Sequence, residues 1–232
     1  MRIQVIFGAL ALALACGAGA QAKPVINGMW LLDPASFGKG NSLPLSPAAR
    51  KMLEEEEAAA ERGEVIGEDQ LQCLPAGMPM MMTNEFALSF LETPGRITIL
   101  NEMSPLPRTV YLDKAHPADV IPNWNGHSVG RWEGDVLVID TIGLSDRQQK
   151  GTLGFGGVRG TTTHIIERYS ISADGKVLTG QFTYEDPKLL TRPAMATFTY
   201  NRLPEDAPVW EYACEPGGEG WADRFAGDKA AK

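Results

Sequence analysis

The sequence predicts an all-β protein, in which about eight strands form an antiparallel meander that closes as a barrel. Two observations predict this fold class. Short segments with apolar residues at alternating positions fill the middle of the chain, and turn sequences such as Thr93-Pro94-Gly95 and Glu133-Gly134-Asp135 separate them. Consecutive strands joined by such short turns pair with their neighbours along the chain, so a barrel is expected, with a β-sandwich as the next alternative.

The elements are expected in a simple order. Residues 23–45 are rich in proline and glycine and are expected to be an irregular lead-in. Ser46-Pro47 then begins a short surface helix that ends at Gly63, with serine as its N-cap. The expected strands are Phe86–Glu92, Arg96–Glu102, Thr109–Leu112, His127–Trp132, Val136–Thr141, Thr163–Ser172, Lys176–Glu185, Ala194–Leu203 and Val209–Cys214.

The N-terminus has the features of an export signal. Arg2 precedes an apolar run over residues 3–15, and Ala20-Gln21-Ala22 places small residues where a signal peptidase cleaves, so we expect cleavage before Lys23. A retained anchor and a lipoprotein modified at Cys16 are the alternatives. We therefore expect a periplasmic or secreted protein, with a signal peptide (1–22), a lead-in and helix (23–70), a barrel domain (71–215) and a flexible tail (216–232).

The composition excludes several classes of partner. The formal net charge is −8, which argues against binding to nucleic acid and to anionic membrane surfaces. The first apolar run is too short to span a bilayer and no second one follows, so membrane insertion is not expected. The sequence is compatible with an oligomer. A small-molecule ligand or substrate is the expected partner.

Two cysteines remain after the signal segment, Cys73 and Cys214. Disulfides persist in an exported protein, and a bridge between these two would close a loop of about 140 residues and contribute about 4–5 kcal/mol in the chain-entropy model. The alternative is a pair of separate buried thiols. A metal site is not expected from two cysteines without CxxC spacing.

The candidate site consists of ionisable residues on otherwise apolar strands. Glu167 lies on the more apolar face of its strand, which it shares with Tyr169, while Arg131 shares a face with His127. Because a charge inside a barrel is costly unless it is paired, we expect Arg131, His127 and Glu167 to converge in the interior. The full set of expected catalytic residues is His127, Arg131, Glu167 and Glu102, and the expected substrate-binding residues are Trp124, Trp132, Tyr169 and His164.

Each of these residues also has a structural interpretation. Glu167 could pair with Arg168 or Arg131 at the rim, and His127 could be a hydrogen-bonded core histidine. A metal site built from His127, His164 and Glu167 is geometrically conceivable, but we expect no metal and no cofactor. The sequence contains no GxSxG, P-loop, GxGxxG or HExxH motif. The glycine-rich segment 143–160 is a candidate flap over a pocket.

The string Trp124–Thr141, WNGHSVGRWEGDVLVIDT, resembles the most recognisable segment of a large family of exported, poorly characterised bacterial proteins. The resemblance covers most of the chain after the signal segment, including Cys73–Pro79, Glu102, Arg108 and the late Cys214. It implies a lipocalin-like β-barrel with a pocket for one small ligand. It implies no particular reaction. The chain departs from the family pattern at Lys114-Ala115 and in the segment before His164.

Two functions follow from these expectations. The first is a cofactor-independent lyase or isomerase that acts on a small aromatic or apolar compound. In this hypothesis Arg131 holds an anionic oxygen, His127 or Glu167 moves a proton, and Trp124, Trp132 and Tyr169 form apolar walls. The second is a non-catalytic carrier of such a compound. The recurrence of Glu, His and Arg on apolar strand faces favours the enzyme by a narrow margin.

Overall fold

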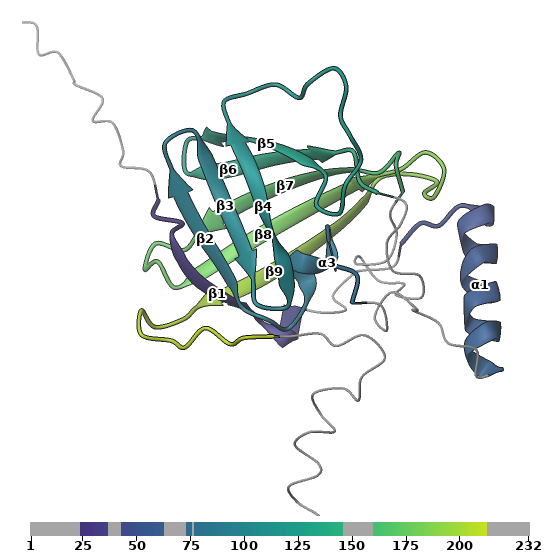
Figure 1. Ribbon diagram of the computed structural model, residues 1–232, viewed down its shortest axis with the longest axis horizontal. Coiled ribbons are helices and arrows are strands. Elements are labelled where there is room, and N and C mark those ends of the chain that lie inside the picture. The colour runs from purple at the N-terminus through teal and green to yellow at the C-terminus, as the bar shows by residue number, and fades with distance from the viewer. Residues whose placement is uncertain (1–23, 37–42, 63–72, 76, 146–159, 213–232) are drawn as a thin grey trace, which may run out of the picture.

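A computed structural model describes residues 24–36, 43–62, 73–75, 77–145 and 160–212 of the chain. Its centre is a closed barrel in which neighbouring strands follow the order β1 to β9 (Figure 1). The strands are β1 (Gly28–Leu32), β2 (Leu88–Thr93), β3 (Arg96–Asn101), β4 (Ser104–Leu112), β5 (His127–Glu133), β6 (Val136–Ile142), β7 (His164–Ile171), β8 (Val177–Glu185) and β9 (Ala194–Arg202). The predicted fold class, an all-β barrel, is confirmed.

Two strands differ from the expectation. β1 lies inside the segment expected to be an irregular lead-in and pairs with both β2 and β9, so the barrel begins before residue 71. β4 begins at Ser104, five residues before the expected start at Thr109, because two prolines obscured its first half. Residues 209–212, expected to begin a last strand, form no strand.

The number of strands explains one parallel pair. Strands that close in sequence order alternate in direction, so an odd number of strands requires one pair with the same direction. That pair is β4 and β5, in which Val110 lies opposite Ser128 and Leu112 lies opposite Gly130. The connection over residues 113–126, which we call the return loop, therefore has to run back along the barrel before β5 can begin.

Helices contribute little to this fold. The helix α1 (Pro47–Glu61) stands beside the barrel, and Ser46 caps it by accepting a hydrogen bond from the Ala49 amide at 3.2 Å, as predicted (Figure 1). The short helix α3 (Met80–Thr83) was not predicted and lies at one end of the barrel. No helix in the described part of the chain is long and apolar enough to span a lipid bilayer.

The barrel interior is filled by side chains from alternate strand positions. The large aromatic residues at its centre are fully buried and contact one another edge to face, with ring centroids 5.8 Å apart for Phe90 and Tyr169 and 5.4 Å apart for Phe182 and Phe198. Such offset contacts are the favoured geometry for aromatic pairs. The interior is thus an aromatic core that surrounds any polar group placed within it.

Candidate functional site

One polar cluster lies in the middle of this apolar interior. The guanidinium of Arg108 binds both carboxylate oxygens of Glu167, with 3.0 Å between Nη1 and Oε1, and both side chains are completely buried. Arg108 also donates from Nε to Ser128 Oγ at 3.1 Å and from Nη2 to Thr141 Oγ1 at 2.9 Å. Tyr169 donates its hydroxyl hydrogen to Glu167 Oε1 at 2.6 Å. We call these five residues the interior polar cluster.

The strand register brings the cluster together. Ser128 and Thr141 lie opposite each other on β5 and β6, and their hydroxyl oxygens are 2.9 Å apart. Glu167 on β7 lies opposite Ile139 on β6, and Tyr169 follows Glu167 two residues later on the same face of β7. Arg108 reaches the cluster from β4 because it shares the inward face of Val110, which lies opposite Ser128.

Burial and charge together set the protonation states in the cluster. Burial alone lowers the pKa of Arg108, but Coulombic attraction and hydrogen bonding from Glu167 hold that pKa above its ordinary value. Burial, followed by the negative charge of Glu167, raises the pKa of the Tyr169 hydroxyl well above its usual range. Tyr184 and Tyr200 are shifted in the same direction for the same two reasons. The barrel interior therefore contains one ion pair among neutral phenols.

A group of buried methionines closes the interior on the side of α3. Met78, Met81 and Met82 are almost wholly excluded from solvent, and we call them the methionine cap. Tyr200 links the cap to the barrel wall by donating its hydroxyl hydrogen to the Met82 carbonyl at 2.8 Å. Methionine side chains are unbranched and adapt to the shape of their neighbours. This end of the barrel is consequently closed by side chains that can rearrange.

The structure does not bring the expected catalytic residues together. Glu167 and Tyr169 face inward as predicted, but Arg131 lies on the outer surface, where its side chain is 59% exposed and its Nε donates to Glu133 Oε1 at 2.9 Å. His127 shares that outer face. The expectation that Arg131 and His127 meet Glu167 in the interior is wrong, because the residues of β5 that point inward are Ser128, Gly130 and Trp132.

Arg108 takes the place expected for Arg131. In the sequence, Arg108 was identified only through the family resemblance, because Pro105 and Pro107 argued against a strand in this segment. The alternation of residues after Pro107 nevertheless indicated which way Arg108 points. Arg108 alternates with Val110 and Leu112, so a strand extended toward the N-terminus would have placed the arginine on the same apolar face.

A second cluster of ionisable residues lies on the outer wall. Asp140 Oδ1 is 3.0 Å from His116 Nε2 and also 3.0 Å from His164 Nε2. His116 Nδ1 faces His127 Nδ1 at 2.8 Å, and His164 Nδ1 faces Glu185 Oε2 at 3.1 Å. The chain has three histidines, and all of them belong to this group, which we call the outer histidine cluster.

The hydrogen-bond partners of His164 favour its charged form. Both of its ring nitrogens face carboxylate oxygens, which only accept, so the geometry favours hydrogen on both nitrogens, as in an imidazolium. Accordingly the hydrogen bond to Asp140 raises the pKa of His164, and the same contact lowers the pKa of Asp140. His127 behaves differently, because burial and then the neighbouring His116 lower its pKa.

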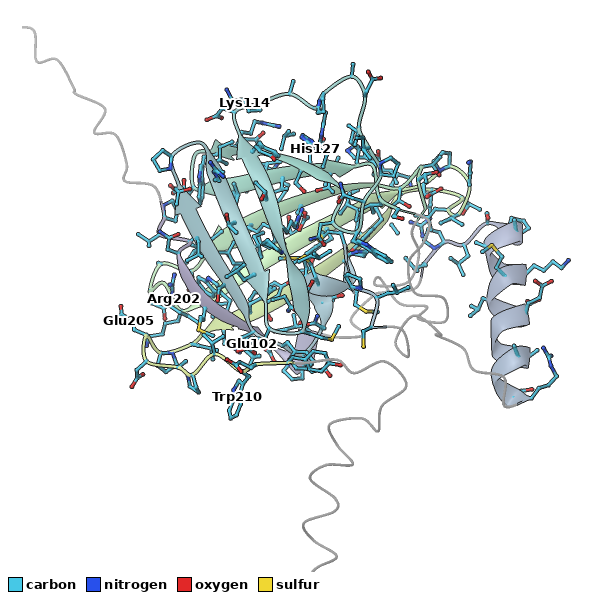
Figure 2. The ribbon with its side chains drawn as sticks, viewed as in Figure 1. Glu102, Lys114, His127, Arg202, Glu205 and Trp210 are labelled. Carbon is cyan, nitrogen blue, oxygen red and sulfur yellow. The ribbon has the colours of Figure 1, made fainter. Side chains whose placement is uncertain are left out.

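The remaining predicted residues lie elsewhere. Glu102 accepts hydrogen bonds from the amides of Ala87 and Trp210, at 3.1 and 2.9 Å, and Figure 2 shows it far from His127 on the barrel. Trp132 points inward and donates to Glu92 Oε1 at 3.2 Å. Trp124 lies near the end of the return loop, where its carbonyl accepts from the Met78 amide at 2.9 Å.

Other predictions concern parts of the chain that the structure does not describe. Cys214 lies outside the described residues, so its disulfide with Cys73 stays a prediction. The same holds for the signal segment 1–22, the tail 216–232 and most of the expected flap, residues 146–159. In the described ranges, no three or more His, Cys, Asp or Glu side chains are arranged to hold a metal ion. The conceivable set of His127, His164 and Glu167 is split, since Glu167 faces inward and both histidines face outward.

Comparisons with known proteins add little to this geometry. No protein-family model matches the chain, and no curated protein matches it. Among solved structures, a chain described as "REP1-NXSQ fatty acid transporter" is similar, with a TM-score of 0.34 and 12% sequence identity over 77% of this chain and 96% of that chain. A TM-score this low carries no argument, so the function has to be inferred from the site itself.

Proposed function

We propose that this protein is a non-catalytic carrier that binds one small, uncharged and mainly apolar compound inside the barrel. The observation that carries the proposal is the interior polar cluster, an ion pair with no net charge set among aromatic side chains. Small-molecule sites have this composition, with apolar and aromatic walls and a few placed polar groups that orient the ligand. An uncharged ligand fits best, because Glu167 already neutralises Arg108.

The hydrogen-bonding inventory of Arg108 supports a ligand with one acceptor oxygen. A guanidinium has five N–H hydrogens. Four of them have acceptors, namely Ser128, Thr141 and the two oxygens of Glu167. Among the described residues, the second hydrogen on Nη1 has no acceptor. A carbonyl or ether oxygen of the ligand would complete the set.

The methionine cap supplies the route of entry in this proposal. A ligand that displaces Met78, Met81 or Met82 from the barrel end replaces one set of apolar contacts by another, so the exchange costs little. Tyr200 joins the two regions, since its hydroxyl binds the Met82 carbonyl and its ring lies in the interior. The ligand would lie between the cap and the interior polar cluster.

The same cluster favours a carrier over the lyase or isomerase that the sequence suggested. An acid–base enzyme needs a group that is free to take a proton near the substrate. Both oxygens of Glu167 are bound by Arg108, and Oε1 also accepts from Tyr169. The raised pKa values of Tyr169, Tyr184 and Tyr200 keep these phenols protonated. The proposal keeps the expected periplasmic or secreted location, which rests on the export signal and the family resemblance.

Binding of a neutral aromatic ketone tests the proposal. Prodan, a naphthalene carrying one carbonyl, fluoresces according to the polarity and hydrogen bonding around it. The key variant is Arg108→Met with Glu167→Leu, which removes the ion pair while keeping apolar volume. We expect prodan to bind the wild type and to bind this variant about tenfold more weakly, because one hydrogen bond to a charged donor is lost.

The matched control carries the same change on the outside of the barrel. Arg131→Met with Glu133→Leu removes an exposed ion pair and should leave prodan affinity unchanged. Equal affinity of both double variants would contradict an interior site, as would a wild type that binds no probe. Mass spectrometry of recovered compounds separates the two hypotheses, because a chemically altered product would establish an enzyme in place of a carrier.

A further inference from the structure

The return loop is fastened to the barrel wall by a single side chain along its first half. The Asp113 amide donates to the Gly130 carbonyl at 2.8 Å, and the loop rejoins the wall where Asn123 and Gly143 pair, at 3.1 Å. Between Asp113 and Val120 only His116 is partly buried, and its neighbours are exposed. The position of this half of the loop therefore depends on the two hydrogen bonds of His116, to Asp140 and to His127.

The contact between His116 and His127 has a strict protonation requirement. Two ring nitrogens 2.8 Å apart can share a hydrogen bond only if one donates and the other accepts. Asp140 takes a hydrogen from His116 Nε2, so the pair satisfies its partners while at least one ring is neutral. When both rings are protonated, two N–H groups point at each other and two like charges lie within 3 Å.

Among the described residues, three strands and the loop itself supply groups near the pair or near its partner Asp140. Tyr111 on β4 stacks on the His127 ring, with centroids 5.2 Å apart. Asp140 on β6 stabilises positive charge, but it already pairs with the His164 imidazolium on β7, whose other nitrogen binds Glu185 on β8. On the loop itself the charged residues are Asp113, Lys114 and Asp119. One carboxylate shared between two histidines cannot also neutralise His127.

We propose that the contact between His116 and His127 is an acid-labile latch, which holds the return loop on the barrel wall at neutral pH and releases it when both rings become protonated. The lowered pKa of His127 places this second protonation below the ordinary histidine range. The loop also contacts the methionine cap, because the Trp124 carbonyl accepts from the Met78 amide. The return loop is thus joined to the methionine cap at the barrel end by one hydrogen bond, so release of the loop can affect the cap.

Amide hydrogen exchange of the full chain measures the latch directly and needs no ligand. The amides to follow are those of Asp113 and Asn123, which donate to the Gly130 and Gly143 carbonyls at the two ends of the return loop. After correction for intrinsic exchange, we expect opening at these two amides to increase roughly fivefold or more between pH 7.5 and pH 4.5, which is the effect of losing about one hydrogen bond. In His127→Gln the amide side chain can both donate and accept, so opening should no longer depend on pH over this range.

The matched control is His164→Gln, which alters the other histidine bound to Asp140 and leaves the latch in place. Its loop should still open on acidification. Exchange that is independent of pH in the wild type would overturn the proposal, and so would a pH response that survives in His127→Gln and disappears in His164→Gln. Because exchange is followed without any bound compound, these outcomes do not depend on whether the barrel is a carrier.

Discussion

At the scale of single residues, Arg108 and Glu167 depend on each other. Both are fully buried, so removal of one leaves a bare charge in an aromatic interior. We expect Arg108→Met to lower the free energy of unfolding by about 3–5 kcal/mol, whereas Arg108→Met with Glu167→Leu should recover most of that loss. Denaturant titration measures both. Arg131→Met on the outer wall is the control and should lower the free energy of unfolding by less than about 1 kcal/mol. If Arg108→Met cost as little as Arg131→Met, the Arg108–Glu167 pair would not be buried.

His164 makes stability depend on pH with a defined sign. Its pKa in the folded state is raised by Asp140, so the charged ring stabilises the fold. That contribution is complete below the unfolded-state pKa of about 6.5 and disappears as the pH rises through the folded-state value. We therefore expect the difference in Tm between the wild type and His164→Gln to be larger at pH 6 than at pH 9. A difference that grows toward pH 9 would contradict the assignment of His164 as an imidazolium.

The same residues show what the sequence could predict of the site. Glu167 and Tyr169 were correctly assigned to one apolar face, because strand alternation depends only on local spacing. Arg131 was assigned to the interior because its strand has no apolar face that clearly dominates: the inward positions of β5 are Ser128, Gly130 and Trp132. The partner of Glu167 is set by pairing between β4 and β5, which are joined by a long loop. Local alternation carries no information about that pairing.

At the scale of elements, the parallel pair of β4 and β5 is a short pairing in the barrel wall. It contains three paired positions, as β1 does with β2 and with β9, whereas β5 and β6 share seven. Gly130 permits this contact, since a Cβ atom there would lie 2.7 Å from Val110 Cγ1 and 3.3 Å from Leu112 Cδ2. Two strand segments were missed in the sequence. β1 contains a glycine and pairs with β2 and β9, which are distant in the chain, whereas the first half of β4 contains two prolines and pairs with the preceding strand β3.

Substitution of Gly130 tests how tightly this pair is packed. We expect Gly130→Ala to lower the free energy of unfolding by about 1–3 kcal/mol, because Val110 and Leu112 are buried and have to move. Gly160→Ala is a suitable control, since the nearest atoms to its Cβ are 3.8 Å away, and it should change stability by less than about 0.5 kcal/mol. If chemical denaturation showed the same small loss of stability for Gly130→Ala and Gly160→Ala, β4 and β5 would have to separate easily enough to accept a methyl group.

At the scale of the whole molecule, the barrel closes where β1 meets β9. Arg202 fastens this closure by donating to three carbonyl groups, those of Gly175, Asn27 and Val25, at 2.6, 2.7 and 2.8 Å. Its guanidinium carbon also lies 4.0 Å from the centre of the Trp30 ring. Gly28 makes room for it, because a Cβ atom there would lie 2.6 Å from Arg202 Nη1. The turn before β8, the segment before β1 and β9 itself are thus joined by one side chain.

Loss of this side chain should weaken the whole barrel, because an open sheet leaves the backbone groups of both edge strands unpaired. We expect Arg202→Met to lower the free energy of unfolding by about 2–3 kcal/mol, and Arg202→Lys to have an intermediate effect, since an ammonium keeps the charge but lacks the planar fork. Arg168→Met, which removes an exposed partner of Glu133, should cost less than about 1 kcal/mol in the same denaturant titration. If Arg202→Met lowered the free energy of unfolding as little as Arg168→Met does, the pairing of β1 with β9 would hold the barrel closed without Arg202.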